Sequence, residues 1–302
     1  MSERKILLIG SSGQVGNSIE SLIQDKYELV TLNRPVLDFT KPKKLKSLIL
    51  KISPSIIINA TGYTSVDLAE SEPDLAYICN QDAPRFLAKI CDKENILLIH
   101  FSTDYVFDGT KKEAYLEKDA CNPLNVYGLS KRQGEIEISK SGCKHFIFRT
   151  SWVYGPVRNN FLKTILELSS VERSINVVDD QIGLPTSTEL ISLIVEKCID
   201  LYFIKDLKET DYGIYHLAPF GKVSWYGFAC AIIKKATKEG FEIKIKEKDI
   251  KRISSKEYSF VAQRPMNSVL NISKLNNFLG IRIHNWEKYL NKVLKQIRMG
   301  SI

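Results

Sequence analysis

The chain has 302 residues, of which 44% are hydrophobic and 26% are charged, as in an average folded globular protein. This composition excludes wholesale disorder, a collagen-like repeat and a solvated tail protein, and the length predicts about two domains or one large one. The formal net charge of +8 favours an anionic ligand and leaves nucleic acid, a membrane surface and a phosphorylated small molecule open as its source.

Cysteine, histidine and hydropathy patterns exclude several kinds of site. The six cysteines include no CxxC pair and mostly lie in apolar or helix-like runs, which predicts buried free thiols in a reducing compartment. The four histidines lack metal-ligand spacing, so no metal site is predicted. The apolar run before Gly10 is too short for a signal-peptide core, and no run approaches the ~20 apolar residues that cross a bilayer. We therefore expect a cytoplasmic protein with no membrane partner.

The first half of the chain alternates strand-like and helix-like segments. Strands are predicted at residues 5–9, 28–32, 55–59, 96–102 and 145–150. Helices are predicted at about residues 17–24, 40–52 (with Thr40 as N-cap and Pro42 in the first turn) and 72–94, and another precedes the last strand. This rhythm predicts an α/β fold with a Rossmann-type doubly wound parallel sheet, whose ligand site lies at the carboxyl ends of the strands.

The second half loses this rhythm at about residue 151, where the segments become shorter and more aromatic. We expect residues 1–150 to form the Rossmann domain and residues 151–302 to form mainly a smaller C-terminal domain over the strand ends. No linker rich in Gly, Pro or Ser separates the halves, which predicts that some later segments return to the first domain.

A glycine-rich turn, GSSGQVG, follows the first predicted strand. Gly10, Gly13 and Gly16 are spaced as GxxGxxG rather than GxGxxG. Glycines here allow a tight turn and close approach of backbone N–H groups to a pyrophosphate, and the following helix N-terminus adds a partial positive charge. The motif therefore predicts that residues 1–150 bind NAD or NADP.

The end of the second predicted strand bears on which dinucleotide is bound. The carboxylate that usually binds the adenosine ribose is missing there, because the strand ends TLNR. Arg34 is available to pair with a 2′-phosphate, which favours NADPH and leaves NADH open. Asp38 and Phe39 follow, and we expect them to pack around the adenine.

A tyrosine and a lysine four residues apart form a second motif. Tyr127 and Lys131 stand on a predicted helix, where positions i and i+4 share one face. A nearby ammonium lowers the pKa of a tyrosine, so the pair suits proton transfer to a carbonyl oxygen. Thr103 follows the fourth predicted strand, and its hydroxyl can donate a second hydrogen bond to that carbonyl. These three residues resemble the catalytic set of extended short-chain dehydrogenase/reductases.

Longer motifs carry a closer resemblance. They include NATGYTSVDLAESEP (59–73), FSTDYVFDGT (101–110), FRTSWVYGP (148–156), VVDDQIGLPT (177–186) and RPMNSVLN (264–271). From residue 5 to about residue 290 the chain resembles the dTDP-4-dehydrorhamnose reductase family. The resemblance implies NADPH-dependent reduction of the C4 ketone of dTDP-4-dehydro-6-deoxy-L-mannose to dTDP-L-rhamnose, with the sugar nucleotide bound mainly by residues 151–302.

The resemblance also implies roles for individual residues. Thr103 and Tyr127 would bind the ketone oxygen, Tyr127 would donate the proton, and Lys131 would bind the nicotinamide ribose and lower the pKa of Tyr127. The other implied cofactor contacts are Gly13, Gln14 and Val15 at the pyrophosphate, Asp38 and Phe39 near the adenine, and Thr61, Gly62 and Tyr63 on the nicotinamide side. The implied substrate contacts are Asp104 and Trp152 at the sugar and Arg264 at the diphosphate, where a structural salt bridge is an equal alternative.

Two departures from the family pattern concern the cofactor wall and the assembly. Thr61 and Gly62 stand in a motif that is usually richer in alanine. Some members dimerise around magnesium held by acidic residues; one of those positions is Ser18 here, while Glu189 remains. The sequence therefore does not predict a magnesium-bridged dimer, and it leaves a homodimer open.

Two other functions stay open at this point. They are reduction of another keto sugar nucleotide and a non-catalytic regulatory role, as in the regulatory subunit of methionine adenosyltransferase, which resembles this family. The intact Thr103, Tyr127 and Lys131 favour an enzyme. A nucleic-acid partner is not expected, because the lysines are dispersed and the short cluster at residues 41–46 suits a solvated helix face.

Overall fold

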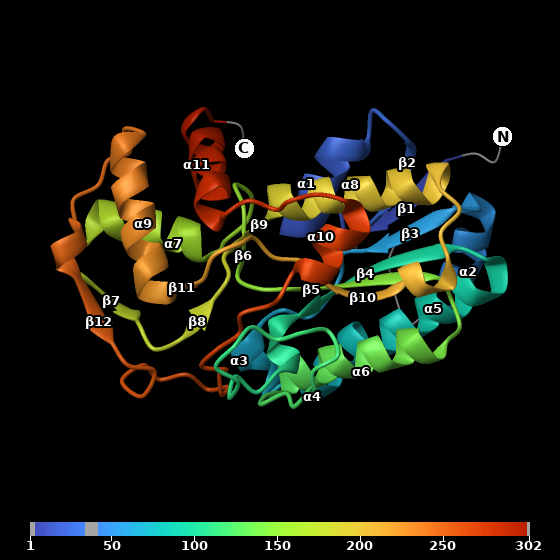
Figure 1. The fold of residues 1–302 in the computed structure, drawn as a ribbon, viewed down its shortest axis with the longest axis horizontal. Coiled ribbons are helices and arrows are strands. Elements are labelled where there is room, and N and C mark those ends of the chain that lie inside the picture. The colour runs from blue at the N-terminus through green and yellow to red at the C-terminus, as the bar shows by residue number, and fades with distance from the viewer. Residues whose placement is uncertain (1–3, 34–41, 301–302) are drawn as a thin grey trace.

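The computed structural model describes residues 4–33 and 42–300. Its largest sheet contains β1 (Lys5–Ile9), β2 (Glu28–Leu32), β3 (Ile56–Asn59), β4 (Leu97–Thr103), β5 (His145–Thr150) and β10 (Gly213–His216). These six strands lie in the order β10-β5-β4-β3-β1-β2, and every neighbouring pair is parallel (Figure 1). The first five match the predicted strands to within a residue at each end, which confirms the α/β fold and the parallel Rossmann-type sheet.

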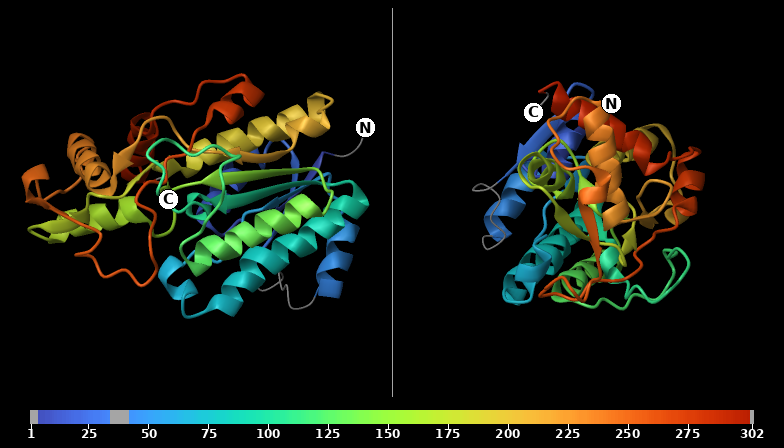
Figure 2. Two further views of the ribbon diagram at one scale, coloured as in Figure 1. Left: turned by 60° about the horizontal axis from the view of Figure 1, so that its bottom comes forward. Right: turned by 90° about the vertical axis from the view of Figure 1, so that its left-hand side faces the viewer.

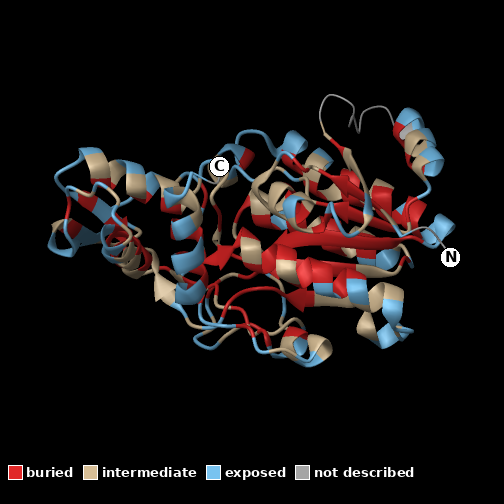
Figure 3. Ribbon diagram, turned by 90° about the horizontal axis from the view of Figure 1, so that it is seen from above, coloured by how far each residue is buried: buried red, intermediate tan, exposed pale blue. Residues whose placement is uncertain are grey.

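Helices cover both faces of this sheet (Figures 1 and 2). One face is covered by α1 (Gln14–Ile23), α8 (Thr188–Ile204) and α10 (Ser273–Leu279). The other is covered by α2 (Pro42–Ile52), α5 (Ala83–Glu94) and α6 (Val126–Lys140). Because side chains alternate along a strand, Ile6 and Leu8 pack under the first layer while Leu7 and Ile9 pack under the second. The central strands are accordingly almost entirely buried (Figure 3).

The helix predicted at residues 72–94 is interrupted by one π-helical turn. It consists of α4 (Pro73–Tyr77), the π turn Ile78–Asp82 and α5, and the short α3 (Val66–Ala69) precedes it. The π turn carries the buried Asn80, whose carbonyl lies so close to Gly134 of α6 that a Cβ there would overlap it. The two helices therefore pack closely at this point.

A smaller lobe lies beyond the carboxyl ends of the strands. It contains α7 (Phe161–Val171), α9 (Trp225–Lys238) and α11 (Trp286–Arg298), with three short strand pairs: β6 (Val153–Tyr154) with β9 (Thr186–Ser187), β7 (Ile175–Val178) with β12 (Ile250–Ile253), and β8 (Ile182–Gly183) with β11 (Val223–Ser224). Its helices share a separate apolar core that includes Leu162, Phe228 and Leu290. Between these segments the chain returns to the large sheet through α8 and β10.

Two further expectations can be compared with the structure. Cys91, Cys121, Cys143, Cys198 and Cys230 are free thiols, and all of these except Cys121 are buried. Within residues 4–33 and 42–300, no helix combines the length and the apolar character that a bilayer crossing requires.

Candidate active site

A cavity of about 720 Å³ lies at the carboxyl ends of β1, β3 and β4. The chain order of the sheet reverses between β1 and β3, and open α/β sheets bind their ligands at such a point. Both the large sheet and the smaller lobe contribute to its walls. The predicted site residues that line it are Gly13, Gln14, Val15, Thr61, Gly62, Thr103, Asp104, Tyr127, Lys131 and Trp152.

The glycine-rich turn forms one end of this cavity. Gly10 has a φ of +89°, a backbone conformation that favours glycine, and a Cβ at Gly16 would overlap the carbonyl of Gly10. Gly13 is the N-cap of α1, so the helix begins at Gln14, three residues before the predicted start at residue 17. The first-turn N–H groups of a helix lack intrahelical partners, which makes this end suited to an anion.

Asn33 ties the glycine-rich turn to the end of β2. Its Oδ1 accepts a hydrogen bond from the Ser12 N–H at 3.1 Å, and its Nδ2 donates to Ser11 Oγ at 2.8 Å. The predicted adenosine contacts Arg34, Asp38 and Phe39, like the predicted N-cap Thr40, lie outside the described residues.

The start of α6 places Tyr127 against the end of β4. Asn125 caps the helix, because its Oδ1 accepts a hydrogen bond from the Gly128 N–H at 2.8 Å. Gly128 lets the first turn approach closely, since a Cβ there would overlap the carbonyl of Tyr105. Tyr127 therefore lies beside Thr103, and both residues line the cavity.

The hydroxyl group of Thr103 makes two hydrogen bonds with its neighbours in the chain. Its Oγ1 accepts from the Tyr105 N–H at 3.1 Å and donates to Asp104 Oδ1 at 3.1 Å. Asp104 is buried, and burial raises the pKa of its carboxyl group to about 7. Its Oδ2 has no hydrogen-bond partner among the described residues. The site thus contains a carboxyl group that can be neutral or charged near physiological pH.

Lys131 lies one helical turn beyond Tyr127, as predicted. Its Nζ donates to the Phe101 carbonyl at 3.2 Å, and burial lowers the pKa of its ammonium to about 8. The expected lowering of the pKa of Tyr127 is not found: burial raises this pKa to about 12, although the neighbouring Thr103 side chain acts to lower it. The physical reason is that desolvation of the phenolate is the dominant influence in this closed site.

Two tryptophans form the wall that faces the smaller lobe. Trp152 stacks on Trp225, with ring centroids 3.5 Å apart and an interplanar angle of 6°. A Cβ at Gly183 would overlap the Trp152 indole, so that ring is held closely. Trp225 Nε1 donates to Gln181 Oε1 at 3.2 Å. Trp152 itself has a φ of +45°, which is rare for a large side chain.

Four predicted residues lie around the cavity without lining it. Gly10 and Gly16 lie against each other within the glycine-rich turn and do not reach the cavity wall. Tyr63 donates from its hydroxyl to Glu72 Oε2 at 2.6 Å, and its backbone pairs with the Asn80 side chain. Arg264 Nη2 donates to Asp67 Oδ2 at 2.8 Å, which favours the structural salt bridge for that residue.

The structure adds three residues that the sequence did not single out. Asn80 Nδ2 donates to the Tyr63 carbonyl and to Ser130 Oγ, and so joins β3, the π turn and α6. Trp225 and Arg158 line the cavity from the smaller lobe. Trp225 is the first residue of α9, and Arg158 lies between the motifs at residues 148–156 and 177–186.

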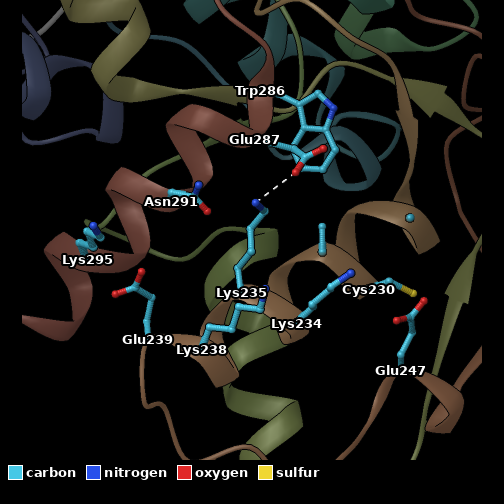
Figure 4. Close-up of a pocket in the computed structure, with 12 residues that line it drawn as sticks. Cys230, Lys234, Lys235, Lys238, Glu239, Glu247, Trp286, Glu287, Asn291 and Lys295 are labelled. Atoms are coloured by element: carbon cyan, nitrogen blue, oxygen red, sulfur yellow. Dashed lines mark ion pairs between the residues drawn. The ribbon is translucent and has the colours of Figure 1, made fainter.

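A second cavity, of about 630 Å³, lies between α9 and α11 in the smaller lobe (Figure 4). Lysine and glutamate side chains dominate it, and Lys235 Nζ pairs with Glu287 Oε2 at 3.0 Å. None of the described site residues predicted from the sequence lines it. The chemistry therefore belongs to the cavity at the strand ends.

Comparison with known proteins agrees with this geometry. The profile of the protein family described as RmlD substrate binding domain matches residues 4–299. The dTDP-4-dehydrorhamnose reductase of Aggregatibacter actinomycetemcomitans is 38% identical over 96% of this chain and 98% of its own length. The enzyme of the same name from Escherichia coli K12 is 34% identical over 97% of each chain. This chain belongs to the dTDP-4-dehydrorhamnose reductase family.

Solved structures place other members of the dTDP-4-dehydrorhamnose reductase family on the same fold. The enzyme of Bacillus anthracis, solved in complex with NADP, is 32% identical, covers 97% of this chain and 99% of its own, and superposes with a TM-score of 0.88. A UDP-glucose 4-epimerase of Thermus thermophilus, only 16% identical, has a TM-score of 0.77 over 99% of this chain and 100% of its own, which shows a shared fold.

The described residues fit the cofactor of this family. The tight glycine-rich turn and the N-terminus of α1 suit a pyrophosphate, and the buried ammonium of Lys131 suits a ribose hydroxyl. The unpartnered Oδ2 of Asp104 provides a hydrogen-bonding atom in the wall of the same cavity.

The two positions considered for a bridging magnesium ion, Ser18 and Glu189, are each paired with another described residue. Ser18 Oγ donates to Ser192 Oγ at 3.2 Å, and the Lys292 ammonium pairs with Glu189 Oε1 at 2.6 Å. A lysine cation beside Glu189 repels a metal cation electrostatically. In the described part of the chain, no three or more His, Cys, Asp or Glu side chains form a group that could hold a metal.

Proposed function

We propose that this chain catalyses NADPH-dependent reduction of the C4 ketone of dTDP-4-dehydro-6-deoxy-L-mannose, giving dTDP-L-rhamnose. One observation carries the proposal: the cavity that contains the glycine-rich turn is also lined by Thr103, Tyr127 and Lys131, the last two on one face of α6. The names of the relatives support the substrate, and the NADP complex of the Bacillus anthracis enzyme supports the cofactor.

Tyr127 is suited to act as the general acid. Its pKa of about 12 keeps the phenol protonated at neutral pH, so the proton is available when the ketone is reduced. When bound in this cavity, NADPH would supply the hydride that C4 receives. Tyr127 then donates its proton to O4 while Thr103 donates a hydrogen bond to the same oxygen, and both stabilise the negative charge that grows there.

Lys131 is suited to bind the cofactor. Its ammonium binds the nicotinamide ribose, and with a pKa of about 8 it is charged at neutral pH. Gly13, Gln14 and Val15 bind the pyrophosphate at the start of α1, while Thr61, Gly62 and Tyr63 shape the nicotinamide side of the site.

Asp104 and Trp152 bind the sugar. Asp104 offers its free Oδ2 to a sugar hydroxyl, and the indole of Trp152, supported by Trp225, provides a flat apolar wall for the ring.

Turnover by the purified chain tests this function. NADPH oxidation is followed with dTDP-4-dehydro-6-deoxy-L-mannose and with its UDP counterpart, and the product sugar is identified by NMR. We expect turnover of the dTDP sugar and a product with the configuration of L-rhamnose. Turnover of a different keto sugar nucleotide only would contradict the substrate, and NADPH binding without turnover would favour the regulatory alternative.

The Tyr127→Phe variant tests the general acid. We expect kcat to fall by roughly 10²–10⁴-fold, because the proton donor is lost, while the Kd for NADPH stays unchanged. Tyr258→Phe, which alters an exposed tyrosine, is the matched control and keeps full activity. Normal kcat in Tyr127→Phe would rule out the proposed acid.

A further inference from the structure

Arg158 reaches from the smaller lobe to the glycine-rich turn. Its Nε donates to the carbonyl of Ser12 at 3.0 Å, across 146 residues of sequence. Ser12 precedes Gly13, the N-cap of α1, and its own N–H is bonded to Asn33 at the end of β2. The guanidinium is therefore anchored at the turn that precedes α1.

The segment that carries Arg158 is fixed by a second contact with the same turn. Asn160 caps α7, and its Nδ2 donates to Gln14 Oε1 and to the Gly155 carbonyl, each at 2.9 Å. The side chains of Arg158 and Asn160, two positions apart, thus bind Ser12 and Gln14 of the glycine-rich turn. These contacts between the smaller lobe and the glycine-rich turn fix the position of the guanidinium.

The backbone of Arg158 is strained. Its φ of +65° lies in the left-handed region, where a residue with a Cβ is disfavoured relative to glycine. Strained residues of this kind cluster at binding and active sites, where the side chain contributes something that glycine cannot supply.

The charge balance of the cavity points to what Arg158 supplies. Among the described residues that line the cavity, only Lys131 and Arg158 carry a fixed cationic side chain. Lys131 is directed toward the Phe101 carbonyl, so Arg158 is the cation beside the glycine-rich turn. With Nε bonded to Ser12, its two Nη groups remain as a planar fork, the geometry that matches a phosphate.

We infer that Arg158 is a binding residue for a phosphate group of the dinucleotide cofactor, held across the glycine-rich turn by the smaller lobe. The inference rests on the proposed function, since it requires a dinucleotide in this cavity. NADPH contains two kinds of phosphate that Arg158 could bind, the diphosphate bridge and the 2′-phosphate. NADH contains only the diphosphate bridge, so a comparison of the two cofactors distinguishes them.

The test compares wild type, Arg158→Gly and Arg158→Lys by calorimetric titration with NADPH and with NADH. Arg158→Gly removes the guanidinium and relieves the backbone strain, so we expect an unchanged or higher Tm without ligand. We expect its Kd for NADPH to rise roughly tenfold or more, because a charged hydrogen-bond partner is lost. We also expect its Kd to depend less on salt than that of wild type. Arg158→Lys keeps the charge without the fork and is expected to lie between the two.

The two cofactors separate the two phosphates. An equal loss of affinity for NADPH and NADH identifies the diphosphate bridge, and a loss confined to NADPH identifies the 2′-phosphate. Arg173→Ala changes another exposed arginine of the same lobe and is expected to bind both cofactors as wild type does.

Three results would overturn the inference. If Arg158→Gly binds both cofactors with the Kd and salt dependence of wild type, Arg158 contacts no cofactor phosphate. If its cofactor Kd is unchanged and only the KM for the sugar nucleotide rises, the residue serves the other ligand. If wild type itself binds neither NADPH nor NADH, the proposed function fails together with the inference.

Discussion

Gly62 and Lys131 share a space that only a residue without a side chain leaves open. A Cβ at position 62 would lie 2.7 Å from Lys131 Nζ and 3.1 Å from Asn80 Oδ1. The strand-end motif that departs from the alanine-rich family pattern therefore sits directly against the lysine that the proposed mechanism uses.

Gly62→Ala is expected to weaken NADPH binding roughly tenfold, because the ammonium is displaced from a charged hydrogen bond to the ribose. The Tm should change little, since the ammonium is the flexible end of its side chain and can move. Titration of NADPH into the variant measures the effect. A double-mutant cycle with Lys131→Ala is the control: with Lys131 removed, Gly62→Ala should add no further loss. A full additional loss would show that Gly62 acts through another group.

Asp104→Asn is expected to change how stability depends on pH. The pKa of Asp104 is about 7 in the folded protein and ordinarily 3.8, so between these values the folded state binds more protons than the unfolded state. The contribution of this group to stability is therefore present at low pH and is lost as pH rises toward 7. The Tm of Asp104→Asn minus that of wild type should increase from pH 4 to pH 7 and then level off. A difference that is constant with pH would contradict the raised pKa.

Glu135→Ala is expected to destabilise the fold by about 3–5 kcal/mol, because it leaves a buried arginine without its counter-charge. Arg149 Nε and Nη2 each donate to a Glu135 oxygen at 2.8 Å, and the two side chains are 1% and 0% exposed. Urea unfolding measures the change. Asp82→Ala breaks the exposed pair with Arg85, in which the side chains are 44% and 41% exposed, and should cost less than about 1 kcal/mol. If both variants lose a similar free energy of unfolding, burial does not determine how much an ion pair contributes to stability here.

Chelation of divalent metals is expected to leave activity and molar mass unchanged, because Lys292 already neutralises Glu189. Turnover and light scattering with and without EDTA measure this. In Lys292→Glu two carboxylates would face each other, so added magnesium should raise the Tm of that variant and not that of wild type. Loss of wild-type activity in EDTA, restored by magnesium, would show that the enzyme does need a divalent metal.

The sequence predicts most of the sheet and the centre of the site. Residues 5–9 form an apolar run that ends at Gly10, and residues 145–150 contain the apolar run FIF after a predicted helix; the structure confirms a strand at both places. Thr103, Tyr127 and Lys131 could be found because each follows a recognisable signal at a strand end or on a helix face. Each of these signals is a pattern of residues close together in the chain, which can be seen in a single sequence.

The remaining features depend on contacts between distant segments. The π turn at Ile78–Asp82 lies just before Pro84, which has no N–H to donate to the carbonyl of Asn80, and this carbonyl packs closely against Gly134 of α6. The raised pKa of Tyr127 follows from burial, which no spacing reveals. Arg158 lies outside every matching motif, and only its position beside Ser12 makes it a candidate.

The return of α8 and β10 to the large sheet has a consequence for synthesis on the ribosome. A nascent chain that ends at residue 150 contains five of the six sheet strands but lacks β10, which pairs with β5. It also lacks α8, so Ile19 and Ile23 of α1 have no Ile191, Ile194 or Val195 to pack against. The cofactor-binding half therefore reaches its final packing only after much of the smaller lobe has been translated. The two halves of the chain therefore depend on each other for their final packing.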